Sequence, residues 1–394
     1  MVKASFFPAP RIGAGVLREA NVAEEAMETA RPEALVDPAA PKDIERHKMP
    51  PAQRENNFGL LRVTLATLVI LTHSFYFVDG NALREPLIRW FHTLEFGDVA
   101  VDGFFIISGY LVTRSFLQSR SRAEYLGKRV LRIYPGYIMA CAVSVLIGIN
   151  VGATLPHIDF SLIMVAYVQL LLMCGVHLDH TFAHSAYPGV NGSLWSISYE
   201  FRCYLLLILL GLLGAFRSKR IVGFLTVCFL LWVTMVDVTS TVGGNMMWGS
   251  LAGNVRAIAL FLAGSSFFLF EDAIAYSRVY VAISLAALVV LLPYSNLATT
   301  ALAVFGGYII FWFALHGPTS SFSRAANRTD LSYGVYLYAW PVGELIVQYF
   351  NGISPWLVFS FTVLIVYPVA FVSWVLIEKP ALGLKRFLTK EHGF

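Results

Sequence analysis

The chain of 394 residues is 57% hydrophobic and 14% charged, and its mean hydropathy is +0.64. A soluble domain carries about a quarter charged residues, so the composition excludes a soluble globular protein and predicts a multi-pass membrane protein. The net charge of +4 does not indicate a nucleic-acid partner, because the basic residues of membrane proteins act as topology signals. Four separate cysteines in apolar runs indicate neither a metal site nor a disulfide framework.

The first 56 residues differ from the rest of the chain. They contain seven prolines and few aromatic residues, a composition typical of a flexible segment. They include no apolar run before a small-residue cleavage site, so we expect a tail and not a signal peptide. The predicted organisation is a flexible cytoplasmic tail at 1–56, a transmembrane domain at 57–380 and a short cytoplasmic tail at 381–394.

Eleven segments of the transmembrane domain are candidates for crossing the lipid bilayer. Long apolar spans of this kind must be helices, because a bilayer offers no partner to unpaired backbone groups. The candidates are 58–78, 98–117, 134–152, 160–176, 194–216, 221–240, 254–271, 277–293, 296–316, 331–350 and 355–377.

The distribution of basic residues reduces this count to ten. Basic clusters lie at 114–132, 217–220, 324–328 and 379–390, and all four face the cytoplasm only if segment 160–176 does not cross. We interpret that segment as an interfacial or re-entrant piece on the outer side. The predicted fold class is therefore an all-α polytopic membrane protein. It is a bundle of ten transmembrane helices in the inner (plasma) membrane, with both termini cytoplasmic.

The first span carries Arg62 near its predicted cytoplasmic end and His73 deeper in the membrane. Eleven positions are about 3.06 turns of an α-helix, so the two side chains point along nearly the same face, roughly 16 Å apart. A neutral histidine is cheap to bury and can exchange a proton near neutral pH. Other ionisable residues at membrane depth mark either a site or a structural ion pair. They are Asp102, Glu200, Arg202, Arg256 and Glu344.

The second span contains the stretch "VDGFFIISGYL" (Val101–Leu111). Gly103 and Gly109 lack a side chain, and we expect both to let another backbone come close.

Two further stretches place polar residues at regular helical spacing. "KRVLRIYPGY" (Lys128–Tyr137) puts Arg129 and Arg132 one turn apart. Arginines at that spacing can grip a phosphate, although a positive-inside anchor has the same pattern. "NGSLWSISYEFRCYLL" begins at the outer face and places Ser196 and Glu200 on one face of a helix, four residues apart.

In their order along the chain, these motifs resemble the acyltransferase 3 family of integral-membrane acyltransferases. Six motifs occur in the family's order over residues 56–380. They are R-x10-H, FF-x-x-SG, R-x-x-R before YP, LWS-x-x-x-E, "LSYGVYLYAWPV" and the closing "EKP". Each motif alone is weak evidence, whereas their ordered coincidence is specific. One position departs from the family: many members have a histidine where this chain has Ala339. Chemistry assigned to that second histidine does not carry over, which leaves His73 as the candidate base.

The resemblance implies an O-acyltransferase that uses cytoplasmic acyl-CoA, with acetyl favoured and succinyl open, and a glycan acceptor at the cell surface or in export. It places Arg62, His73, Arg129, Arg132 and Glu200 in the functional set. We expect the three arginines to bind the donor phosphates. We expect His73 to act as general base, and Glu200 either to orient it or to hold the acceptor. A covalent acyl-histidine intermediate is less favoured, because direct attack needs no additional step. The expected acceptor contacts are Asn191, Ser193, Trp195 and Ser196.

Two other function classes would also use buried polar residues. A transporter or flippase for a glycan or small solute needs intramembrane arginine, histidine and glutamate residues. Against it stand the arginine pair, which suits a nucleotide, and the absence of a recognisable internal repeat. The third class is a non-catalytic membrane scaffold. Release of CoA from labelled acetyl-CoA separates the enzyme from both.

Overall fold

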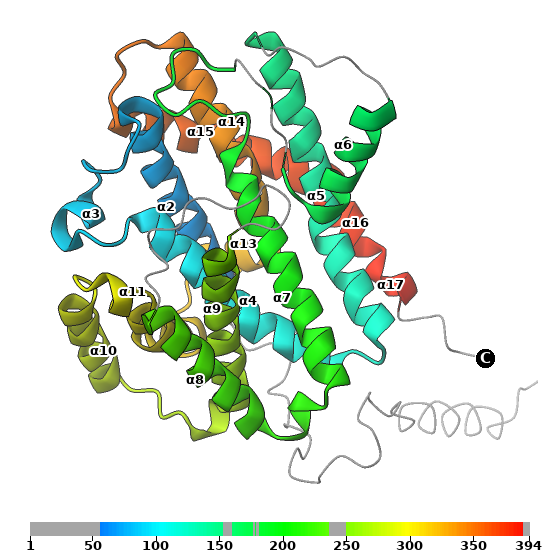
Figure 1. The fold of residues 1–394 in the computed structure, drawn as a ribbon, viewed down its shortest axis with the longest axis vertical. Helices are drawn as coiled ribbons and strands as arrows, with labels where there is room; N and C mark the ends of the chain where they lie inside the picture. Colours follow the sequence, from blue (N-terminus) through cyan, green and yellow to red (C-terminus); the bar gives the residue numbers. More distant parts are fainter. Residues whose placement is uncertain (1–55, 153–159, 176–177, 179–180, 236–249, 389–394) are drawn as a thin grey trace, which may run out of the picture.

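The structure is a computed structural model that describes residues 56–152, 160–175, 178, 181–235 and 250–388. Within these ranges the regular secondary structure is entirely helical (Figure 1). The predicted tail at 1–56 lies outside the described residues except for Asn56, so its flexibility and location stay predictions. The helices before residue 236 are α2 (Phe58–Asp79), α3 (Pro86–Phe91), α4 (Phe96–Gln118), α5 (Arg122–Asn150), α6 (Phe160–Leu172), α7 (Trp195–Leu212) and α8 (Lys219–Met235).

The second half of the chain continues the bundle. Its helices are α9 (Leu251–Leu269), α10 (Arg278–Leu291), α11 (Ser295–Ala301), α12 (Gly307–His316), α13 (Ser321–Arg328), α14 (Ser332–Tyr349), α15 (Pro355–Ser373), α16 (Lys379–Gly383) and α17 (Lys385–Leu388). Two π-helical turns, η4 (Leu302–Gly306) and η5 (Trp374–Glu378), interrupt otherwise continuous helices. Such turns occur often at functional sites, and Trp374 of η5 lines the cavity described below.

Seven helical stretches among the described residues are long and apolar enough to cross a membrane. They are Phe58–Asp79, Phe96–Gln118, Arg122–Asn150, Gly192–Leu212, Leu251–Leu269, Ser295–His316 and Pro355–Leu388. Each overlaps one of the predicted spans, which confirms a polytopic all-α protein.

The other predicted spans correspond to shorter helices. The spans at 221–240, 277–293 and 331–350 are α8, α10 and α14, which have 17, 14 and 18 residues. Segment 160–176 forms α6, with 13 residues, which reach only about 20 Å at 1.5 Å per residue against a hydrocarbon core of about 30 Å. Its position in or on the membrane stays a prediction.

The helix ends follow local sequence signals. α2 ends at Gly80, whose φ of +73° is left-handed and whose N–H donates to the Tyr76 carbonyl. α5 begins after Ser121, whose hydroxyl accepts from the Glu124 N–H. α15 begins with Ser354 as N-cap and a proline at its first position. These signals mark the end of α2 and the starts of α5 and α15.

Helices α4 and α9 pack backbone to backbone. A Cβ atom on Gly109 would lie 2.0 Å from the Phe261 carbonyl oxygen, and one on Gly264 would lie 1.9 Å from the Ile106 carbonyl oxygen. The close approach predicted at Gly109 is confirmed. The same prediction for Gly103 was wrong, because the neighbour there is the Leu65 side chain at 3.0 Å and not a backbone. Gly103 instead makes room for a leucine of α2.

One pair of intramembrane charges is structural. The Arg256 guanidinium on α9 donates from Nε and Nη2 to the Asp102 carboxylate on α4, both at 3.0 Å, and Asp102 is 2% exposed. Asp98 lies 3.4 Å from the same guanidinium. This bidentate pair ties α4 to α9 and satisfies both charges within the bundle.

The site is positioned by the helices around α2. Helix α2 contacts α4, α14 and α15, while α5 contacts α14 and the C-terminal helices α16 and α17. Figure 1 shows α5, α16 and α17 on one side of the bundle, with α8, α10 and α11 on the opposite side. The helices that bear the polar motifs therefore meet on the α5 side of α2 and α4.

Candidate functional site

A cavity of about 400 Å³ lies between α2, α4, α5, α7, α14 and the C-terminal helices. The charged residues in its lining are Arg62, Arg129, Arg132, Glu200, Asp330 and Lys385. Aromatic side chains of Phe104, Tyr204, Tyr333, Tyr336 and Trp374 form much of the remaining wall. Arg62 from one motif and the Arg129–Arg132 pair from another therefore line one cavity.

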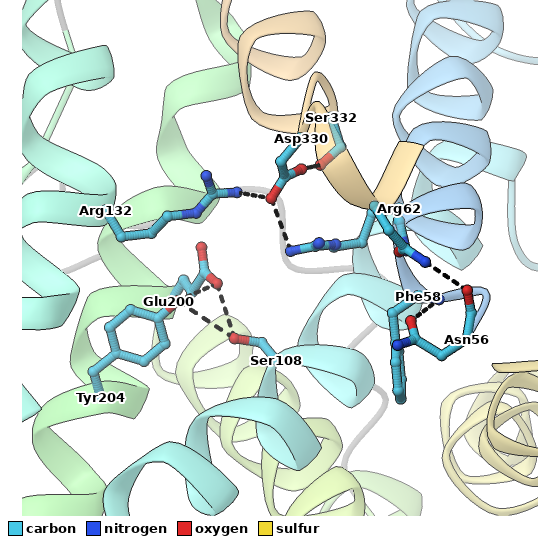
Figure 2. Close-up of polar contacts among 11 residues, drawn as sticks. Asn56, Phe58, Arg62, Ser108, Arg132, Glu200, Tyr204, Asp330 and Ser332 are labelled. Atoms are coloured by element: carbon cyan, nitrogen blue, oxygen red, sulfur yellow. Dashed lines mark hydrogen bonds and ion pairs between the residues drawn. The ribbon is translucent and has the colours of Figure 1, made fainter. Parts of the chain in front are cut away.

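Two of these arginines converge on Asp330, as Figure 2 shows. Arg132 Nη2 donates to Asp330 Oδ2 at 2.6 Å, and Arg62 Nη1 lies 3.1 Å from the same oxygen. Ser332 donates to the other oxygen, Oδ1, at 2.7 Å. Asp330 lies on the turn between α13 and α14, so this cluster joins α2, α5 and α14.

The arginines keep Asp330 ionised. Burial alone would raise the pKa of this carboxyl group, but Arg132 and Arg62 outweigh burial and hold its pKa at about 2. Asp330 therefore carries a negative charge at any physiological pH. Sequence reasoning missed this residue, and the available signal was an acid directly before the "LSYGVYLYAWPV" motif.

Arg129 has different neighbours from Arg132. Its Nη2 donates to Ser115 Oγ at 3.2 Å, and its guanidinium lies 5.8 Å from the centre of the Tyr204 ring. Arg132 instead lies over the Tyr333 ring at 5.4 Å. The two arginines thus line the same cavity at separate positions on its wall, each stacked on an aromatic ring.

Glu200 lies in the cavity wall and is held by two hydroxyl groups. Its Oε1 accepts from Ser108 Oγ at 2.9 Å and from Tyr204 OH at 2.5 Å (Figure 2). One turn earlier on α7, Ser196 shares a hydrogen bond of 2.6 Å with Tyr336 OH. Ser196 and Glu200 both line the cavity, as expected from their spacing of four residues.

His73 is not among the residues that line this cavity. Its ring lies edge-on to Trp340, with centroids 4.6 Å apart, and 6.0 Å from Phe77. Its Nδ1 is buried and has no hydrogen-bond partner among the described residues. The structure therefore separates the predicted base from the arginine cluster, with His73 further along α2 against α14.

Of the four residues predicted to contact the acceptor, only Ser196 lines the cavity. Trp195 is 50% exposed and packs against Tyr199. Asn191 is buried and donates to Ser144 Oγ and to the Leu337 carbonyl, at 3.1 and 2.9 Å. The Ser193 hydroxyl is buried without a partner in the described part of the chain. Asn191 thus makes helix-packing contacts in this structure.

Two other ionisable residues at membrane depth lie outside the cavity lining. Arg202 donates to Asn254 Oδ1 at 2.9 Å and lies over the Tyr199 ring. Glu344 is fully buried, and neither of its carboxylate oxygens has a hydrogen-bond partner within the described ranges. Among the described residues, no group of three or more histidine, cysteine, aspartate or glutamate side chains has an arrangement that could hold a metal.

Comparisons with known proteins agree with the motifs. The chain is 27% identical over 347 residues to an "O-acetyl transferase" of Shigella phage Sf6, covering 86% of this chain and 97% of that protein. It is 28% identical over 361 residues to "Nodulation protein 10" of Rhizobium leguminosarum bv. viciae, covering 84% and 95%. No solved structure matches the chain significantly. Residues 55–376 match the acyltransferase 3 family, described as an acyltransferase domain, and the chain therefore belongs to this family and is a multi-pass membrane acyltransferase.

Proposed function

We propose that this protein transfers an acyl group, with acetyl favoured, from cytoplasmic acyl-CoA to a hydroxyl group of a cell-surface or exported glycan. The observation that carries the donor assignment is the basic cavity, in which Arg62, Arg129 and Arg132 meet Lys385. Arginine binds phosphate through charge-assisted, geometrically specific hydrogen bonds. The relative named as an O-acetyl transferase supports acetyl as the group transferred to oxygen.

The donor enters in this proposal from the end of the bundle that holds Arg62. Its phosphates bind the arginines, and its pantetheine arm extends along α2 toward His73. The helix rise places His73 roughly 16 Å from Arg62, about half the thickness of the hydrocarbon core. An extended pantetheine arm spans that distance, so one molecule reaches both residues although His73 lies outside the cavity lining.

His73 is the proposed general base. Its imidazole accepts the proton of the acceptor hydroxyl, whose oxygen then attacks the thioester carbonyl. The carbon–sulfur bond breaks, and the proton returns from the imidazolium to the leaving thiolate, giving free CoA and an ester. General base catalysis of this kind contributes typically 10²–10⁴ in rate. The Nδ1 of His73 has no hydrogen-bond partner among the described residues, which supports a role in binding a substrate group.

Glu200 has a separate role in this scheme. Its hydrogen-bond partners among the described residues are Ser108 and Tyr204, and no hydrogen bond or ion pair among those residues joins it to His73. A role in orienting His73 is therefore disfavoured. We assign Glu200 to a substrate N–H or O–H group in the cavity, where a carboxylate accepts a charge-assisted hydrogen bond.

Surface glycans provide the test of the reaction in the cell. Mass spectra of surface and exported glycans from a deletion strain should lack ester groups that are present in the parent, with a mass difference of one acetyl group per site. Complementation with the wild-type gene should restore them. Identical ester content in both strains would contradict the proposed glycan acceptor.

A further inference from the structure

The lining of the cavity has an unequal number of positive and negative side chains. Four cations, Arg62, Arg129, Arg132 and Lys385, line it. The only carboxylates among the lining residues are Asp330 and Glu200, and one oxygen of Glu200 accepts from two hydroxyl groups. The cavity therefore carries more positive than negative charge. Among the described residues, Asp330 is the only carboxylate that forms an ion pair with the arginines of the cavity.

The contact between Asp330 and the arginines is asymmetric. A single oxygen, Oδ2, meets both Arg62 and Arg132, although each guanidinium has five N–H donors. The Nε atoms of Arg62 and Arg129 are buried without a hydrogen-bond partner among the described residues. These donors have lost water without gaining an acceptor. The arginines therefore retain binding capacity for an anion with more oxygens than one carboxylate supplies.

We propose that Asp330 occupies the position of a donor phosphate at Arg62 and Arg132, and that donor binding displaces it from at least one of the two arginines. This inference rests on the proposed use of acyl-CoA. A phosphate offers three or more oxygens and a larger negative charge than one carboxylate, so it saturates donors that Asp330 leaves unpaired. Asp330 then acts as a specificity residue, because only a ligand with enough negative charge competes with it.

The direction of the effect follows from Coulomb's law. A carboxylate within a few ångströms of a bound phosphate repels it, and it also stabilises the unliganded arginines. Both effects weaken binding of an anionic donor. Asp330→Asn keeps the side-chain shape and removes the charge, so it should tighten the binding of CoA. The alternative is that Asp330 mainly fixes the arginine geometry, in which case the same change weakens binding.

The test is a titration of the purified full-length protein in lipid nanodiscs, with CoA, 3′-dephospho-CoA and pantetheine as probes. We expect Asp330→Asn to bind CoA about tenfold more tightly than wild type, to gain less for 3′-dephospho-CoA and to gain nothing for pantetheine. Equal or weaker binding of CoA by the variant overturns the inference. An equal gain for pantetheine also overturns it, because pantetheine has no phosphate.

The matched control is Asp272→Asn, which removes one exposed negative charge outside the cavity lining. It should bind CoA as wild type does. If Asp330→Asn does not fold, the inference is tested instead by infrared difference spectra of the wild-type protein labelled with ¹³C-aspartate. Adding CoA should shift an aspartate carboxylate band, since Asp330 is the only aspartate among the lining residues, and an unchanged band overturns the inference.

The outcomes also separate this inference from the proposed function. If wild type binds CoA and transfers acetyl groups but Asp330→Asn gains no affinity, only the displacement of Asp330 fails. If wild type does not bind CoA at all, the proposal that acyl-CoA is the donor fails.

Discussion

Ser108 on α4 and Glu200 on α7 are joined by a hydrogen bond of 2.9 Å from the serine hydroxyl to the carboxylate. The two residues come from motifs that lie 92 positions apart in the chain. Tyr204 donates to the same oxygen of Glu200. These two hydrogen bonds fix the carboxylate in the cavity wall. A substitution that removes the charge of Glu200 but keeps both hydrogen bonds can therefore test the charge alone.

Glu200→Gln should lower acyl transfer at least about tenfold, since a hydrogen bond to a charged group is worth roughly 1.5–3 kcal/mol. Ser108 and Tyr204 can still donate to the amide oxygen, so we expect the unfolding temperature to change by no more than a few degrees. The control is Glu271→Gln, which alters a similar carboxylate–tyrosine pair with Tyr110 outside the cavity lining. Full activity in Glu200→Gln would show that the charge is not needed.

His73→Ala should insert and fold normally, because it removes a polar group whose Nδ1 has no described partner. Acyl transfer should fall by at least about 10²-fold if His73 is the general base. Rates of ester formation measure the effect, and His316→Ala, which removes a ring in contact with Tyr276, is the control. Near-normal acyl transfer in His73→Ala would contradict the assignment of His73 as the general base.

Arg132→Ala should raise the KM for acyl-CoA about tenfold or more, because a charge-assisted bond to phosphate is worth roughly 1.5–3 kcal/mol. Arg132→Lys should recover only part of the loss, since lysine keeps the charge without the planar fork. Arg122→Ala is the control, because Arg122 belongs to the same basic cluster but is exposed and outside the cavity lining. An unchanged KM and kcat in a correctly inserted Arg132→Ala protein would leave the arginine pair as a topology anchor.

The stability of the protein should fall between about pH 4.5 and pH 8. Burial, together with the Asp98 and Glu85 carboxylates, raises the pKa of Glu95 to about 8 in the folded state. The folded protein then binds a proton that the unfolded chain releases, so stability is present at low pH and is lost as pH rises through the folded pKa. Unfolding temperatures of wild type should drop from pH 5 to pH 8.5, and Glu95→Gln should reduce that drop. The same pH dependence in both proteins would contradict this account.

The proposed topology can be tested with single cysteines in a cysteine-free background. Cysteines at Ser218 and Ser321 should react with impermeant thiol reagents only from the cytoplasm. A cysteine at Ala183, which is exposed in the loop before α7, should react only from outside. Labelling at Ser218 from outside would mean that segment 160–176 crosses the membrane, and it would place the Glu200 stretch at the wrong end for the acceptor.

The cavity residues on single helices were accessible to sequence reasoning. Helical periodicity pairs Ser196 with Glu200, and it puts Arg129 and Arg132 one turn apart, a spacing that suits a phosphate. Their convergence was expected from the family's motif order, and all three predicted arginines do line one cavity.

Asp330 could not be identified in this way. It lies on a turn between helices, where an acid usually faces solvent, and only the packing of α2 and α5 against that turn surrounds it with arginines. The neighbours of His73 also depend on how the helices pack. Helical spacing places it along α2, but its contact with Trp340 depends on how α14 packs. The contact between Gly103 and the Leu65 side chain likewise depends on how α2 packs against α4.

The central claim is that the basic cavity binds an acyl-CoA donor for transfer to a glycan hydroxyl. The most direct measurement supplies acetyl-CoA, labelled in its acetyl group, to the purified protein in nanodiscs with a glycan extract from the deletion strain. We predict that wild type releases free CoA and moves the label to glycan in equal amounts, and that Arg132→Ala does so only at higher donor concentration. No CoA release and no labelled glycan from wild type, at any donor concentration, would contradict the account.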